Sequence, residues 1–149
     1  MLISDGFRRA QKQHTCYLCR ETINKGSRYN YEFHKDNEKV FELHSHCSCE
    51  FIKNELIEWI NAWDGISFDE FHYGVKSFCE DAICKNCIFG FVAADSCFKE
   101  KSYCLDKVGE LLKKYELVRV CPKGYSKMYW ALKPRKIPYT TFPGENKNS

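Results

Sequence analysis

The sequence predicts an α+β fold in which small metal sites replace part of the hydrophobic core. The 149 residues include ten cysteines, several in C-x2-C spacing, and without an export signal this favours metal ligation over disulfides. Segments that alternate like strands are interspersed with segments of helical periodicity. The 44% hydrophobic and 15% aromatic residues are enough for a packed core.

The N-terminal part, residues 1–64, is predicted to form the first metal-binding module. Its first seven or so residues show no periodicity and are expected to be loose. Residues 27–33 alternate as a strand, and residues 39–43 return as its hairpin partner. From about residue 46 to residue 63, apolar side chains recur at helical spacing. The predicted order is therefore turn, hairpin and helix.

Residues 65–135 are predicted to form a second, cysteine-rich helical lobe. Ser67 and Glu70 match the S-x-x-E capping box, so a helix should follow over residues 68–79. A further helix is expected over residues 103–115, where leucine and valine recur on one face.

The C-terminal end is predicted to be a β-hairpin followed by a tail. Residues 117–120 and 128–132 have strand character and flank a Pro-Lys-Gly turn. Residues 136–149 are expected to be largely disordered, because their last part is polar and lacks the apolar side chains of a packed segment.

Two ligand pairs of equal spacing predict the first metal site. Cys16 and Cys19 place two thiolates in one tight turn, and His44 and Cys47 lie where the hairpin should end and the helix begin. Zinc prefers four such ligands in a tetrahedron. The N–H groups at a helix start stabilise thiolate charge.

A second register has the same spacing, because His46 and Cys49 are also three residues apart. We favour the register of His44 and Cys47. It leaves His46 to act at the helix start or in support of the ligands.

Residues 14–60 resemble treble-clef zinc modules. The similarity rests on the C-x2-C pair, on I-x-K-G-x-x-Y over residues 23–29, on the hairpin and on H-x-H-C over residues 44–47. Such modules are common in small bacteriophage and prophage proteins and, more distantly, in LIM-type fingers. The resemblance implies a structural zinc ion and no particular biochemical role. The ligands that it implies are Cys16, Cys19, His44 and Cys47.

Five further cysteines predict a second metal site. Their C-x4-C-x2-C spacing could supply zinc, and it also matches the plant-type [2Fe–2S] pattern. Buried free cysteines, which pack as small hydrophobes, are the third alternative. The pattern is similar to a cysteine motif of phage and Firmicute proteins, which implies four ligands, with Cys97 as an alternative fourth. These ligands are Cys79, Cys84, Cys87 and Cys104.

Charge is unevenly distributed along the chain. Residues 50–106 carry 5 basic and 11 acidic side chains, for −6, whereas residues 107–149 carry 10 basic and 3 acidic, for +7. Cations contact phosphates and aromatic rings stack on unpaired bases, so the C-terminal third is predicted to bind nucleic acid. Its candidate contacts are Lys113, Lys114, Arg119, Lys123, Lys127, Lys133, Arg135 and Lys136.

The sequence lacks the motifs of the common metal-dependent and phosphate-binding enzymes. It has no H-E-x-x-H, no deaminase pairing and no phosphate loop. A full set of four ligands at the first site also leaves no open position for catalysis. We therefore expect a non-enzymatic, phage-type zinc protein.

Three hypotheses for its role remain open. The favoured one is nucleic-acid binding in the cytoplasm of a bacterial host cell. The second is an anti-CRISPR-like inhibitor of a host defence nuclease, whose partner would be a nucleic-acid-processing protein complex. The third is an iron–sulfur redox or sensor protein. No apolar run approaches the roughly 20 residues that cross a bilayer, so no membrane partner is expected.

Overall fold

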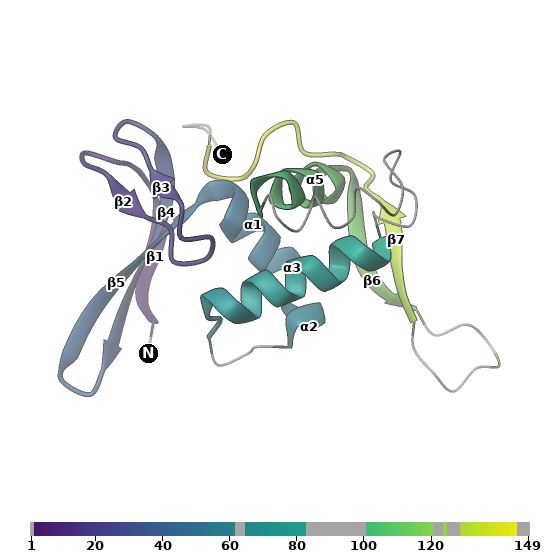
Figure 1. Cartoon of the computed structure of the whole chain (residues 1–149), viewed down its shortest axis with the longest axis horizontal. Coiled ribbons are helices and arrows are strands. Elements are labelled where there is room, and N and C mark those ends of the chain that lie inside the picture. The colour runs from purple at the N-terminus through teal and green to yellow at the C-terminus, as the bar shows by residue number, and fades with distance from the viewer. Residues whose placement is uncertain (1, 62–64, 83–100, 121–123, 125–128, 146–149) are drawn as a thin grey trace.

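Helices and strands are mixed along the chain, which confirms the predicted α+β class. An N-terminal sheet, a group of helices and a C-terminal hairpin follow one another along the long axis of the molecule (Figure 1). The computed structural model describes residues 2–61, 65–82, 101–120, 124 and 129–145.

Three antiparallel strands form the N-terminal sheet in the order β1-β4-β5. Strands β4 (Arg28–Asp36) and β5 (Lys39–His46) are the predicted hairpin, and both extend about three residues beyond the predicted bounds at their C-terminal ends. Strand β1 (Leu2–Arg9) pairs with β4. The prediction that the first residues are loose was therefore wrong, because β4 supplies backbone partners to a segment without a clear pattern of its own.

A two-stranded ribbon lies beside this sheet. Strands β2 (His14–Thr15) and β3 (Thr22–Ile23) are short and antiparallel. They hold the turn that contains the first cysteine pair, and the turn is joined to β5 by a hydrogen bond from the Tyr17 N–H to the His44 carbonyl, 2.8 Å.

The predicted long helix is divided into α1 (Cys47–Glu55) and α2 (Ile57–Ile60). Leu56 separates them with φ −104° and ψ 11°, outside the helical region. Asn61, with φ 59°, ends α2 in the left-handed conformation that asparagine tolerates. The sequence pattern missed the break because the apolar spacing continues through it.

Helix α3 (Phe68–Ala82) begins at the predicted capping box. The Ser67 hydroxyl oxygen accepts the Glu70 N–H at 3.2 Å, and a Glu70 carboxylate oxygen accepts the Ser67 N–H at 3.3 Å. The two residues thus satisfy backbone groups that a helix start leaves without partners.

The C-terminal elements are helix α5 (Lys101–Lys114) and the hairpin of β6 (Tyr115–Val120) and β7 (Tyr129–Pro134). The helix and the hairpin are confirmed. Trp130 of β7 packs on Trp59 with ring centroids 5.6 Å apart.

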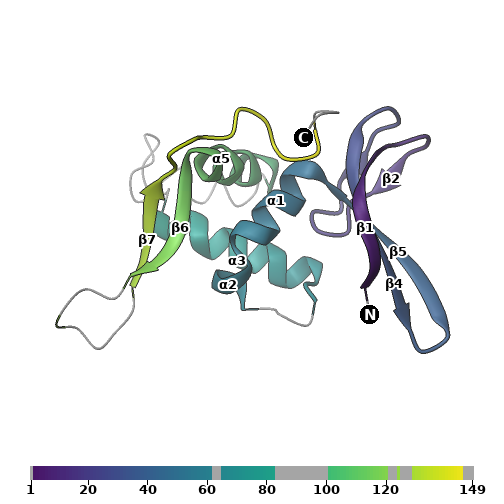
Figure 2. The ribbon, with the colours of Figure 1, turned by 180° about the vertical axis from the view of Figure 1, so that it is seen from behind.

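One hydrophobic core connects these elements. It includes side chains of the cysteine turn, of α1, α3 and α5, with Ile52, Phe71, Phe78 and Leu112 all nearly inaccessible. Seen from behind, α1 lies between the N-terminal sheet and the other helices (Figure 2).

Residues 136–145 pack on the helices, contrary to the predicted disorder of residues 136–149 over this part. The Tyr139 N–H donates to the Lys113 carbonyl at 2.9 Å, and Phe142 packs on Phe51 with centroids 5.5 Å apart. Single aromatic anchors in a polar segment hold the chain here. The sequence pattern does not reveal them.

Candidate metal centre

The first cysteine pair is presented by a tight turn between β2 and β3. The Cys16 N–H donates to the Glu21 carbonyl at 2.9 Å, and the Arg20 N–H donates to the Cys16 carbonyl at 2.8 Å. Arg20 closes the turn with φ 64°. These bonds direct the thiols of Cys16 and Cys19, both buried, to the same side.

The second pair comes from the junction of β5 and α1. His46 is the last residue of β5, and Cys49 lies in the first turn of α1. The ligand atoms of Cys16, Cys19, His46 and Cys49 all lie within 4.8 Å of one another, so the four residues could hold a metal ion. Three of the four are buried, and His46 is half-buried.

The spacing of these atoms fits a tetrahedral ion. Metal–sulfur and metal–nitrogen bonds of about 2.3 and 2.0–2.1 Å place sulfur and nitrogen about 3.6 Å apart in a tetrahedron. The His46 Nδ1 atom lies 3.3 Å from the Cys19 sulfur and 3.7 Å from the Cys49 sulfur. The donor set and its geometry therefore suit a metal that accepts three thiolates and one imidazole.

The other ring nitrogen of His46 has its own partner. Its Nε2 atom lies 3.1 Å from the Thr22 carbonyl oxygen, and a carbonyl can only accept, so Nε2 carries the proton. Nδ1 faces the thiols and is the nitrogen that would bind a metal in place of a proton. A histidine whose far nitrogen is bonded to a backbone carbonyl is typical of metal sites.

The four side chains strongly perturb one another. Hydrogen bonds from Cys19 and Cys49 lower the pKa of the Cys16 thiol far below its usual value. Hydrogen bonds to Cys16 and Cys19 raise the pKa of His46 to about 10. Hydrogen bonding to the same two sulfurs raises the pKa of Cys49. Without a metal, these contacts favour a thiolate at Cys16 beside a protonated His46, and they disfavour one at Cys49.

The predicted register of the second pair, His44 and Cys47, was wrong. Strand β5 continues to His46 rather than ending at Leu43, so the helix begins later relative to the turn. His44 therefore lies over His14, with ring centroids 4.1 Å apart. The Cys47 thiol is directed at the Arg28 carbonyl, 3.6 Å away, and burial raises its pKa to about 11.

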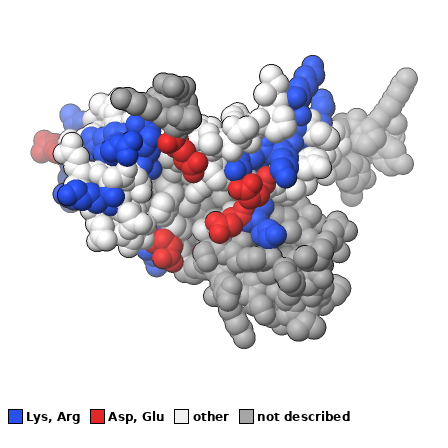
Figure 3. Space-filling model, turned by 90° about the horizontal axis from the view of Figure 1, so that it is seen from above, with Lys and Arg blue, Asp and Glu red and all other residues white. Residues whose placement is uncertain are grey.

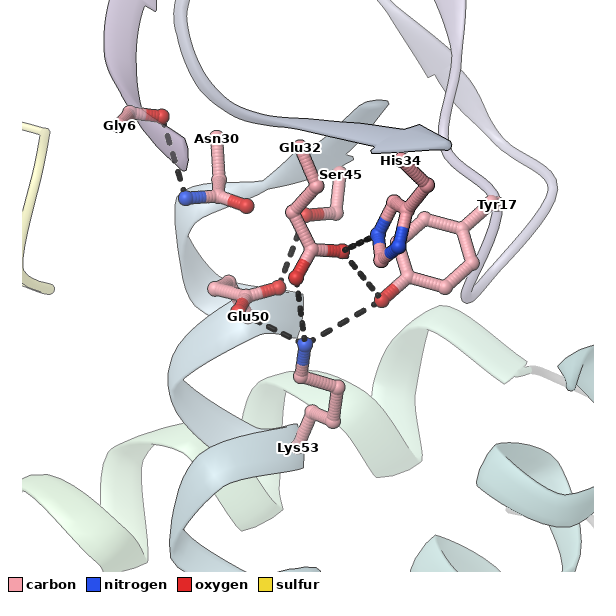
Figure 4. A network of polar contacts seen from close by, with 8 residues as sticks. All are labelled: Gly6, Tyr17, Asn30, Glu32, His34, Ser45, Glu50 and Lys53. Carbon is pink, nitrogen blue, oxygen red and sulfur yellow. Dashed lines mark hydrogen bonds and ion pairs between the residues drawn. The ribbon is translucent and has the colours of Figure 1, made fainter. Parts of the chain in front are cut away.

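A buried polar network joins the segments that carry the ligands (Figure 4). Tyr17 lies between the two cysteines of the turn, Ser45 precedes His46, and Glu50 follows Cys49. The Lys53 ammonium lies 2.8 Å from Glu50 and 3.3 Å from the Tyr17 hydroxyl. The Ser45 hydroxyl donates to Glu50 at 3.1 Å.

Glu32 of β4 completes the network. Its carboxylate lies 3.7 Å from the Lys53 ammonium and 3.3 Å from the Tyr17 hydroxyl. Burial raises the pKa of Tyr17, and burial likewise raises the pKa of Glu50 against the opposing charge of Lys53. The network fixes the cysteine turn, the end of β5 and the start of α1 relative to one another.

The second cysteine cluster lies mostly outside the described residues. Cys84, Cys87 and Cys97 are not among them. Cys79 is buried near the end of α3, and Cys104 belongs to α5. A second site, with zinc or an iron–sulfur cluster, thus stays a prediction.

The predicted nucleic-acid contacts divide into three groups. Arg135 is engaged in the structure, since its guanidinium lies 2.7 Å from the Glu55 carboxylate, and Lys113 pairs with Glu110 at 2.9 Å. Lys123 and Lys127 lie outside the described residues. The exposed ones are Lys114, Arg119, Lys133 and Lys136.

Seen from above, Lys and Arg side chains gather on the left and on the right of the described surface, and most of the visible Asp and Glu lie between them (Figure 3).

Comparisons with protein-family models, with curated proteins and with solved structures find no match to this chain. None of the helices in the described part of the chain is long and apolar enough to cross a membrane.

Proposed function

We propose that the protein is a non-enzymatic, phage-type zinc protein that binds nucleic acid. Its N-terminal module is of the treble-clef type, with one zinc ion held by Cys16, Cys19, His46 and Cys49. The observation that supports the zinc ion is the buried Cys3His set with Nδ1 of His46 directed at the thiols. Three thiolates and an imidazole are ligands that zinc prefers, and four protein ligands are typical of a structural site.

The nucleic-acid part of the proposal is supported by exposed cations at the C-terminal end. Lys114, Arg119, Lys133 and Lys136 are exposed, and Arg119 lies over the Trp130 ring at 4.7 Å. Cations in such positions contact phosphates without reading sequence. We therefore expect binding to be largely independent of base sequence.

Measurement of the metal content tests both the presence of zinc and the register of the His/Cys ligand pair. The tag-free protein should contain one zinc ion at the first site, and a strong chelator should lower its thermal midpoint, because structural zinc binding contributes to folding. Cys49→Ser should lose this ion. Cys47→Ser is the matched control and should keep it. Loss of zinc from Cys47→Ser with retention by Cys49→Ser would contradict the proposed ligand set.

Salt dependence tests the nucleic-acid surface. Lys133→Gln/Lys136→Gln should weaken binding of a single-stranded oligonucleotide and reduce the slope of log K against log salt by about 1.4, at about 0.7 for each phosphate contact. Lys25→Gln/Lys39→Gln changes net charge equally at the other end and should leave the slope nearly unchanged. Binding that is insensitive to salt, or equally weakened by both pairs, would contradict this surface.

An inhibitor of a nucleic-acid-processing protein is the second candidate. A cavity of about 510 Å³ beside the metal centre is lined by four carboxylates, those of Glu21, Asp106, Glu110 and Glu145. An acidic surface of this kind favours a cationic protein partner. Binding of a cationic protein partner that survives added salt and is lost in Asp106→Asn/Glu110→Gln would favour this candidate over nucleic-acid binding.

A further inference from the structure

A cavity of about 600 Å³ opens on the N-terminal module, away from the predicted C-terminal surface. Cations from the end of β1 and the loop after it converge there with histidines of β2 and β5. Its lining includes Arg8, Arg9, Lys12, His14, Glu42 and His44. We propose that this cavity binds a phosphate monoester, the group at the end of a phosphorylated nucleic-acid strand or on a nucleotide.

Arg8 is held in position before any ligand arrives. Its Nε–H donates to the Tyr29 hydroxyl at 2.7 Å, a terminal nitrogen pairs with Glu42, and its guanidinium lies 4.3 Å over the Tyr31 ring. A guanidinium has five N–H groups, and these two bonds use two of them. The remaining ones have the planar arrangement that suits phosphate oxygens.

The other cations complete an exposed rim. The Arg9 guanidinium donates to the Gly26 carbonyl, 2.6 Å, in the turn between β3 and β4. Lys12 and Gln11 are exposed in the loop that follows β1. Arg8 and Arg9 end β1, and the cavity lining includes both of them together with Lys12 of the loop that follows.

Aromatic rings form the inner wall. The His14 ring lies 4.1 Å from the His44 ring and 4.9 Å from the Tyr29 ring. The Nε2 atom of His44 lies 3.1 Å from the Glu42 carboxylate, which orients its ring. Because Glu42 engages the Nε2–H of His44, the ring N–H that can add a neutral donor to the charged rim is that of His14.

The balance of charge favours a monoester over an internal phosphodiester. Three cations and one carboxylate line the cavity, which gives +2 with both histidines neutral. A phosphate monoester carries about −1.5 to −2 at pH 7, and a diester carries one negative charge. A cavity of this size also exceeds the needs of a single phosphate and suits a nucleotide-sized group. The inference that the phosphate belongs to the end of a nucleic-acid strand rests on the proposed nucleic-acid function. The inference that the cavity binds a phosphate monoester does not.

The test compares two oligothymidylates that differ only in a 5′-phosphate or a 5′-hydroxyl, each labelled at the 3′ end. Fluorescence anisotropy of the zinc-loaded protein should show tighter binding of the phosphorylated strand, and inorganic phosphate should compete for it. Arg9→Gln/Lys12→Gln should weaken that preference about fivefold or more, since charge-assisted bonds are lost. Lys12→Gln alone replaces the double variant if the latter does not fold. Lys25→Gln/Lys39→Gln removes the same charge outside the cavity and should keep the preference.

Three outcomes decide the proposal. Equal affinity for the two strands, with no competition by phosphate, would overturn it. Equal weakening by the cavity pair and the control pair would also overturn it, because net charge would then explain the binding. If a nucleoside monophosphate abolishes the preference as effectively as the unlabelled phosphorylated strand does, that result supports the cavity and assigns it to nucleotides. Lys133→Gln/Lys136→Gln should weaken both strands alike, so failure of the C-terminal surface and failure of this cavity are distinguishable.

Discussion

Replacing Lys53 by methionine should destabilise the fold more than the loss of any exposed cation. The Lys53 ammonium lies 2.8 Å from Glu50 and 3.7 Å from Glu32, and the three side chains are 11, 10 and 13% exposed. Methionine keeps most of the volume and removes the charge. Both carboxylates then remain buried without the cation between them, and breaking a buried ion pair in this way costs about 3–5 kcal/mol.

Urea denaturation of the zinc-loaded protein measures this loss in the free energy of unfolding. For a chain of this length, the same change should lower the thermal midpoint by between about 6 and 20 °C. Lys39→Met, at an exposed position next to the β4–β5 turn, is the matched control and should stay within about 0.5 kcal/mol of the original. Glu50→Gln/Lys53→Met should recover part of the loss, because it removes one uncompensated carboxylate.

The same variant should also weaken metal binding. The network fixes the segments that carry the metal ligands, and the loss of such supporting contacts typically costs 10- to 100-fold in affinity, so we expect a drop of about that order. If Lys53→Met lowers the free energy of unfolding by less than about 1 kcal/mol, or by no more than Lys39→Met does, the reasoning is refuted. The carboxylates would then be solvated in the folded protein.

Two further predictions concern the backbone and the helix start. Gly144 has φ 90°, and a Cβ there would overlap the Phe7 ring. Gly26 also has φ 90°, but no atom of the described residues lies within 4 Å of such a Cβ. In urea denaturation, Gly144→Ala should therefore cost clearly more free energy of unfolding than the roughly 1–2 kcal/mol of backbone strain expected for Gly26→Ala. Ser67→Ala removes the cap of α3 and should cost about 0.5–2 kcal/mol, whereas Ser77→Ala, exposed in the middle of the helix, should be neutral or slightly stabilising in the same assay. Equal effects within either pair would contradict these explanations.

The residue types of the candidate metal centre could be predicted from the sequence, but their register could not. His44 with Cys47 and His46 with Cys49 have the same spacing, so the choice depends on where β5 ends. That end is set by the pairing of His46 with Tyr29 across the sheet. Strand pairing is a tertiary interaction, and the spacing of ligands along the chain does not contain it.

Elements with strong local signals were predicted, and elements held by distant partners were missed. The capping box of α3 and the C-terminal helix and hairpin depend on neighbouring residues. Strand β1 is mostly exposed and depends on β4. Residues 136–145 depend on aromatic contacts and on the Arg28 guanidinium, which donates to the Gly144 carbonyl at 2.7 Å. The cationic cavity was missed for the same reason, because its side chains meet only when β1, β2 and β5 are assembled.

Helix α1 connects the metal centre to the C-terminal end of the described chain. Its first turn carries Cys49, and its last residue, Glu55, accepts the Arg135 guanidinium at 2.7 Å. Arg135 follows β7 directly and also donates to the Leu112 carbonyl of α5 at 2.9 Å. The hairpin with the proposed nucleic-acid cations is thus anchored to the same helix that carries a metal ligand. Because the core is continuous from the cysteine turn to α5, we infer that the described parts of the two predicted lobes lose their structure together. Removal of a bound metal should then loosen the proposed nucleic-acid surface as well as the N-terminal module.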